Sequence, residues 1–189
     1  MAGLKQKMKS QLEKEFTELP NDAVALVLLP NKNYEELNME MIKILVNQKK
    51  LSGAYVTINR PYGNIVKIME KEGIDPKKLF FVDCVTEKDE KEDNCTFIKS
   101  AEMLEDMGIS LEPMYSNKSY SFIFFDSIDA LSIYHDTNTV IRFVRSLINR
   151  LRENNMGGIL VGLHEETDKR TVDELAAVCD KIIDANDNQ

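Results

Sequence analysis

Five apolar runs of strand length recur along the chain, each separated from the next by a turn and a segment of helical character. The runs are AVALVLL (23–29), GAYVTIN (53–59), LFFVDCV (79–85), YSFIFFD (120–126) and GGILVGL (157–163). Because they are hydrophobic almost continuously, they indicate strands covered on both faces, as in a parallel sheet. Strands that alternate with helices predict an α/β fold, a three-layer sandwich with a mainly parallel sheet.

Two segments carry a clear helical stripe of apolar residues. The first predicts a helix over 137–153 and comprises Val140, Ile141, Val144, Leu147, Ile148 and Leu151. The second predicts a last helix, capped by Thr167 or Asp168, and comprises Val172, Leu175, Ala176, Cys179, Ile182 and Ile183.

The stretch 86–119 has weaker patterns. We expect the charge run TEKDEKEDN (86–94) to form a solvated loop. A short strand at TFIKS (96–100) and one or two helical turns across 101–115 follow.

The N-terminal 18 residues form a separate pattern. Leu4, Met8, Leu12 and Phe16 recur every four residues on an otherwise charged segment, which predicts an amphipathic helix over 1–18 ahead of an α/β domain at 19–189. Such a helix either packs across its own domain or docks onto a partner or a second subunit. The sequence leaves both interpretations open.

Composition narrows the class of protein. The chain has 32 acidic against 24 basic side chains, so its long-range field repels phosphate backbones and anionic membranes, and we expect no nucleic-acid or membrane partner. No apolar run approaches the roughly 20 residues of a membrane span, and the N-terminus MAGLKQKMKSQLEKEF alternates charge instead of showing a signal-peptide core. Both observations favour a cytoplasmic protein. Three cysteines without CxxC spacing indicate neither a disulfide framework nor a zinc site.

Candidate ligand-binding residues follow the strands. In open α/β sheets, ligands bind beyond the carboxyl ends of the strands, where loops and helix N-termini converge. In chain order the candidates are Asn31, Lys32, Asn33, Arg60, Asp83, Asp126, Ser127 and His164, the last followed by Glu165 and Glu166. The alternative roles are structural: Asp83 and Asp126 capping nearby turns, and His164 closing its strand.

The run YSFIFFDS, in which a buried strand ends in Asp126 and Ser127, resembles the strand that holds magnesium in the RecA/KaiC family of P-loop ATPases. The order of elements from 23 to 185 is similar as well. The resemblance implies a RecA-like P-loop NTPase fold, with Asp126 at the metal position. It also implies that the strand before His164 lies between the first strand and the Asp126 strand, and that Asp83 stands where the family can carry a catalytic glutamate.

The first loop departs from the family pattern. The family has G-x-x-x-x-G-K-[ST] after its first strand, because glycines let backbone amides approach the phosphates and the lysine neutralises them. Here the loop reads LPNKNYEEL, without glycine, and Lys32 comes too early to match the motif lysine. Glu35 and Glu36 place negative charge where a phosphate would bind. The resemblance therefore implies a degenerate Walker A loop and an anion site closed to ATP.

Three functions remain as hypotheses. The first is an inactive RecA/KaiC-like pseudo-ATPase that needs no cofactor and acts as a regulatory or interaction module, with a protein partner or self-association. The second is a degenerate domain that still binds a nucleotide, with residual Mg²⁺, or another small anion through Asn31, Asn33 and Arg60. The third is a metal-assisted hydrolase that uses Asp83, Asp126 and the 164–166 cluster.

Overall fold

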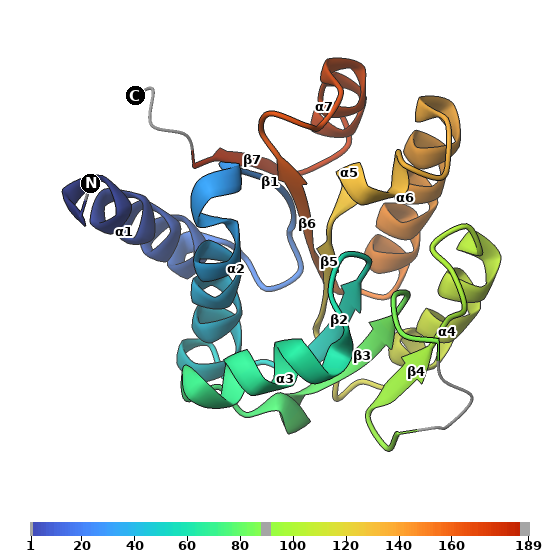
Figure 1. The fold of residues 1–189 in the computed structure, drawn as a ribbon, viewed down its shortest axis with the longest axis horizontal. Helices are drawn as coiled ribbons and strands as arrows, with labels where there is room; N and C mark the ends of the chain where they lie inside the picture. Colours follow the sequence, from blue (N-terminus) through green and yellow to red (C-terminus); the bar gives the residue numbers. More distant parts are fainter. Residues whose placement is uncertain (1, 88–91, 186–189) are drawn as a thin grey trace.

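The chain folds around a seven-stranded sheet whose strands are all parallel. The computed structural model describes residues 2–87 and 92–185, with side chains from residue 6 onward in the first helix. The strand order is β4-β3-β2-β5-β6-β1-β7 (Figure 1). The strands are β1 (Val24–Leu29), β2 (Gly53–Thr57), β3 (Leu79–Asp83), β4 (Cys95–Phe97), β5 (Phe122–Asp126), β6 (Gly157–Leu163) and β7 (Lys181–Asp184). The predicted α/β class and parallel sheet are confirmed, and all five predicted strands are present.

Helices cover both faces of the sheet and make the sandwich three layers deep (Figure 1). One face carries α1 (Ala2–Glu18), α2 (Tyr34–Lys43) and α3 (Tyr62–Lys71); the other carries α4 (Leu104–Ser116), α5 (Ile128–Leu131), α6 (Thr137–Glu153) and α7 (Lys169–Ala176). Short helical turns occur at Asn31–Asn33, Ile44–Gln48 and Pro76–Lys78. Alternate residues of β1 enter opposite cores, which explains why the strand sequences are apolar without interruption.

The apolar stripe of α1 packs against its own domain. Met8, Leu12 and Phe16 are buried in the same core as α2 and α3. Lys49 fastens the end of this helix, because its Nζ donates to the carbonyl oxygens of Phe16, at 3.1 Å, and Leu19, at 2.5 Å. Of the two interpretations left open for this segment, a helix lying across its own domain describes the structure.

The C-terminal prediction was wrong in part. The last helix ends at Ala176, before Cys179. Ile182 and Ile183, which were expected to continue it, lie in β7 at the edge of the sheet, where Ile182 pairs with Leu26 of β1. Ile183 fills the core on one side of β7, whereas Ile182 is half-exposed. The two isoleucines fit a helical stripe and a short edge strand equally well. The strand forms because this segment pairs with β1.

The region after β3 is more ordered than the pattern indicated. α4 runs for 13 residues in place of one or two turns, because Met107, Leu111 and Met114 pack into the second core. β4 begins at Cys95, one residue before the predicted strand. Residues 88–91, the centre of the predicted charge loop, lie outside the described residues. In the described part of the chain, no helix has the length and apolar character to cross a membrane.

Strand register aligns four side chains at the carboxyl edge of the sheet. Asp83 of β3 pairs with Thr57 of β2, which pairs with Asp126 of β5, which pairs with Val161 of β6. The sheet therefore brings both strand-terminal aspartates to the same edge, on either side of β2. This edge is where the candidate site is built.

Candidate functional site

The loop after β1 is bound by carboxylates from the loop after β6. The backbone N–H of Asn31 donates to Glu165 Oε2 at 3.3 Å, and its Nδ2 donates to Glu166 Oε1 at 2.9 Å. Both contacts join segments more than 130 residues apart in sequence, which meet because β6 lies directly beside β1. Two donors in the loop after β1 thus already contact anionic groups of the chain itself.

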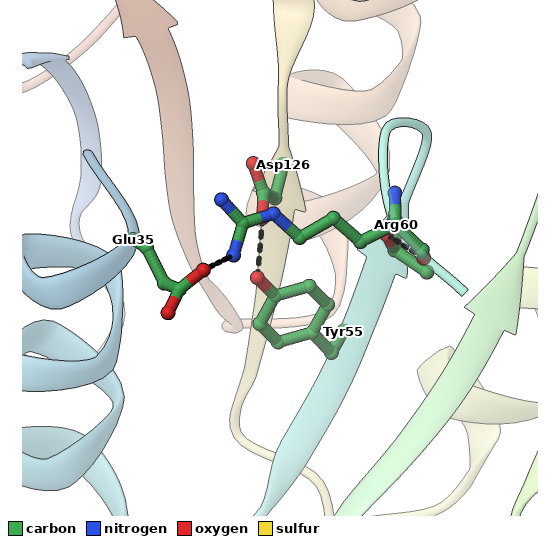
Figure 2. A network of polar contacts seen from close by, with 5 residues as sticks. Glu35, Tyr55, Arg60 and Asp126 are labelled. Carbon is green, nitrogen blue, oxygen red and sulfur yellow. Dashed lines mark hydrogen bonds and ion pairs between the residues drawn. The ribbon is translucent and has the colours of Figure 1, made fainter. Parts of the chain in front are cut away.

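A second carboxylate contact lies at the first turn of α2. Arg60 extends from the end of β2 across the sheet edge, and its guanidinium forms an ion pair with Glu35 (Figure 2). The guanidinium carbon lies 5.9 Å from the ring centroid of Tyr34, the first residue of α2, within range of a cation–π contact. Glu35 lies in the first turn of α2, at the positive end of the helix dipole, so both the dipole and Arg60 attract its carboxylate.

Asp126 is buried beneath this ion pair and has few donors. Its Oδ2 accepts a hydrogen bond from the Tyr55 hydroxyl (Figure 2). Its Oδ1 is buried and accepts no hydrogen bond from the residues that the structure describes. Burial, and to a smaller extent the nearby Asp129 carboxylate, raise the pKa of Asp126 well above the ordinary value for an aspartate. Burial therefore disfavours the charged form of this carboxyl compared with an exposed aspartate.

Ser127 links Asp126 to a second buried carboxyl. Asn59 Nδ2 donates to Ser127 Oγ at 3.0 Å, and that hydroxyl donates to Asp129 Oδ2 at 3.1 Å. Asp129 Oδ1 accepts from the Leu163 N–H at 3.0 Å. Burial raises the pKa of Asp129, although these hydrogen bonds oppose the shift. The chain of contacts ties the ends of β2, β5 and β6 together.

Asp83 is fully occupied by capping. Its Oδ1 accepts from the backbone N–H groups of Val85, at 2.7 Å, and Thr86, at 3.0 Å. Its Oδ2 accepts from the Tyr62 N–H at 2.8 Å and the Thr86 hydroxyl at 2.6 Å. The turn-capping alternative describes this residue, and its four donors leave little capacity to position a water molecule or a metal ion.

The remaining candidate residues lie apart from Asp126 or on the exposed loop. His164 Nε2 is 3.6 Å from Asp184 Oδ2 on β7, the edge strand that lies on the far side of β1 from β5 and β6. Lys32 lies in the short turn after β1, and Asn33 precedes α2 without making a capping hydrogen bond to any described residue. In the described ranges, no group of three or more histidine, cysteine or acidic side chains has a geometry suited to hold a metal ion. The cluster required by the metal-assisted hydrolase is thus not assembled.

A pocket of about 490 Å³ opens at this edge between α2, α5 and the ends of β2 and β6. Its wall includes Tyr34, Asn59, Arg60, Asp129, Ile133 and Glu166. Of the sequence candidates, the structure brings Arg60 into the pocket wall, with Ser127 hydrogen-bonded to Asn59 and Asp129, two residues of that wall.

Two residues of the site were missed from the sequence. Tyr55 carries a hydroxyl in the middle of a fully buried strand, and such a group requires a buried partner, which is a signal that could have been used. Asp129 follows Ser127 by two residues at the start of a short helix, and it was not among the residues predicted from the sequence.

Comparison with known protein families gives a match to the C-terminal part of the chain. Residues 101–185 match the model of a family described as a family of unknown function (DUF7504). The matched segment contains Asp126, Ser127, Asp129 and the loop with Glu165 and Glu166; it excludes the loop after β1 and Arg60. A search of the curated proteins found no match.

Proposed function

We propose that this chain is a RecA/KaiC-like domain that has lost ATP hydrolysis and acts in the cytoplasm as a regulatory or protein-interaction module. The strand order supports the proposal, because β6 lies between β1 and β5, the arrangement that the resemblance implies. Asp126 ends β5 and is followed by Ser127, at the place where the family holds its metal ion.

One observation carries the loss of nucleotide chemistry: carboxylates of the chain occupy the first loop and the first turn of α2. Glu35 pairs with Arg60, and Asn31 donates to Glu165 and Glu166. A triphosphate in the same place would meet three negative charges. It would also have to displace these carboxylates from Arg60 and Asn31 before either could bind a phosphate. No glycine in the loop lets the backbone approach a phosphate closely.

Water activation also lacks a free group. The position that can carry a catalytic glutamate in the family holds Asp83, which accepts four hydrogen bonds from the loop and helix beside it. Burial raises the pKa of Asp126, which disfavours the charged form that Mg²⁺ prefers as a ligand. Hydrolysis thus lacks its base and its metal anchor as well as its phosphate loop.

The test is ATP turnover together with thermal unfolding. We expect no phosphate release above the buffer rate and no rise in Tm with millimolar Mg-ATP. The thermal measurement is sensitive enough, because a ligand present at ten times its Kd would stabilise the fold by about 1.4 kcal/mol. Clear turnover, or a saturable rise in Tm, would contradict the proposal.

A pair of variants tests whether the carboxylates exclude the nucleotide, or whether the domain is unable to bind it for another reason. Replacing both Glu35 and Glu165 by glutamine removes two carboxylates while keeping hydrogen-bonding side chains, and we expect it to allow weak nucleotide-dependent stabilisation. Glu105→Gln, in the first turn of α4 and away from the site, is the matched control and should give no response. A double variant as unresponsive as the control would show that the carboxylates are not what excludes the nucleotide.

The pocket itself favours a second candidate, a domain that still binds a nucleotide or another small anion without efficient hydrolysis. Its volume of about 490 Å³ lies in the range of small-molecule sites, and Arg60 and Asn59 lie in its wall. Asp129 and Glu166 line the same wall and oppose an anion. Native mass spectrometry of the purified protein distinguishes the two, because a retained ligand adds its mass to that of the chain.

A further inference from the structure

The pocket at the carboxyl edge has an acidic wall. Asp129 and Glu166 both line it, and the Glu166 carboxylate adds to the effect of burial in raising the pKa of Asp129. Among the residues that the structure describes, neither of these two carboxylates forms an ion pair with a lysine or arginine. Arg60, the cation of this wall, is paired with Glu35.

Close to Asp129, one buried oxygen has no hydrogen-bond partner among the described residues. Asp126 is only 2% exposed, and its Oδ1 accepts no hydrogen bond from the described residues. Figure 2 shows this oxygen turned away from Tyr55, toward the carboxyl ends of the strands. A buried polar atom without a partner is costly to the fold. The two wall carboxylates favour a ligand that is positively charged and donates hydrogen bonds.

The rim of the pocket is apolar and exposed. Ile133, which lines the pocket, is 76% exposed, and its neighbour Tyr134 is 46% exposed. His135 Nε2 lies 3.2 Å from the Ala101 carbonyl oxygen, which holds this turn beside the segment that carries the exposed Met103. Adjoining exposed apolar side chains next to a polar pocket are typical of a contact surface for a macromolecule.

We propose that the pocket and its rim bind a basic segment of a partner protein, with an arginine side chain between Asp129 and Glu166 and an aliphatic neighbour on Ile133 and Tyr134. A guanidinium presents several donors in one plane, which suits two carboxylates in the wall of one pocket. The chain's net charge of −8 attracts such a segment from a distance. The inference rests on the proposed function, because it assigns the partner to the place that a nucleotide no longer occupies.

Selection from a randomised peptide library displayed on phage, panned against the full-length chain, tests the inference. We expect the enriched peptides to carry an arginine next to a leucine, isoleucine, valine or methionine. Lack of enrichment over panning without the protein would overturn the inference, and so would enrichment of peptides that lack a basic residue.

Variants then locate the binding surface, with the strongest selected peptide as the probe in fluorescence anisotropy. Ile133→Ser should weaken binding about tenfold or more, as expected for losing the burial of one isoleucine. Ile109→Ser is the matched control, since Ile109 is 66% exposed on α4 and outside the pocket, and it should leave the affinity unchanged. Equal affinities for the two variants would contradict the proposed rim.

The acidic wall has its own pair of variants. Glu166→Gln should weaken the same peptide about fivefold, the loss of one partly exposed charge pair. Glu153→Gln, exposed at the end of α6, is the control. Methylguanidine is the small-cation probe, and a Kd as low as that of the peptide would show that the rim takes no part.

Mg-ATP added to the peptide complex separates the two proposals. If ATP binds and displaces the peptide, the proposed function is wrong. If ATP does not bind and no peptide is enriched, the proposed function stands and the basic-segment inference fails.

Discussion

Asp83 and Asp126 end two strands that flank β2 on opposite sides, and their surroundings differ completely. Asp83 accepts four hydrogen bonds, three of them from backbone N–H groups of the loop that follows it and of the first residue of α3. Asp126 is equally buried, accepts one hydrogen bond from Tyr55 among the described residues, and keeps its Oδ1 without a donor. A carboxylate at a strand end is thus structural where the next loop folds back onto it, and is available to a ligand where it does not.

The comparison predicts the largest loss of stability at Asp83. Asp83→Ala leaves three buried or half-buried backbone N–H groups without their acceptor, and we expect the free energy of unfolding to fall by about 3–5 kcal/mol. Asp83→Asn keeps the size of the side chain and one acceptor oxygen, so its loss should be smaller. Urea denaturation followed by circular dichroism measures both. A loss below about 1 kcal/mol for the alanine variant would break the comparison.

Asp126→Asn should act in the opposite direction above neutral pH. Burial raises the folded-state pKa of Asp126 above the unfolded value near 3.8, so the stabilising protonated form is fully present below that value and is lost as pH rises through the folded pKa. The asparagine variant has no charge to lose. We expect it to gain on the wild-type protein as pH increases from 5 to 8, reaching on the order of 1–3 kcal/mol, the desolvation penalty of one unsatisfied buried group. Denaturation curves that shift in parallel for the two proteins would contradict the assignment.

Tyr55→Phe tests the hydrogen bond that Asp126 accepts. It removes the donor to Asp126 Oδ2 while the ring still packs between Phe81 and Phe124. The expected loss is about 1 kcal/mol, the net value of one hydrogen bond. In the Asp126→Asn background the loss should change, since residues in contact are not additive. A double-mutant cycle with no coupling would mean that the hydroxyl and the carboxyl do not interact in solution.

The ion pair above Asp126 should contribute least to stability. Arg60 and Glu35 are both partly exposed, so solvent screens their attraction, and a double-mutant cycle of Arg60→Ala and Glu35→Gln should give a coupling below about 1 kcal/mol. The pair closes the helix N-terminus by charge, with little effect on the fold. A coupling of several kcal/mol would instead make it a structural element like the Asp83 cap.

The sheet could be predicted because its cause is local. Residues that alternate between two cores, as in β1 and β5, leave strands apolar at every position, and this pattern is visible without any knowledge of neighbours. β7 could not be recognised in the same way. Its two isoleucines fit a helical stripe, and only pairing with β1, more than 150 residues earlier, makes them a strand.

The site was partly predictable for the same reason. Glu35 and the glycine-free loop before it are close together in the sequence, and the capping role of Asp83 depends on residues two and three positions later, so both could be anticipated. The Tyr55–Asp126 contact joins residues 71 positions apart, and the contacts of Asn31 with Glu165 and Glu166 span more than 130. These pairs depend on strand order and register, which a single sequence does not determine.

Isothermal titration of Mg-ATP into the wild-type protein tests the closed first loop most directly. The account predicts no saturable heat with ATP at up to several millimolar, because Glu35, Glu165 and Glu166 place negative charge where the proposed function would put a triphosphate. Saturable binding with a Kd below about 1 mM, equivalent to at least about 4 kcal/mol of binding free energy, would contradict it.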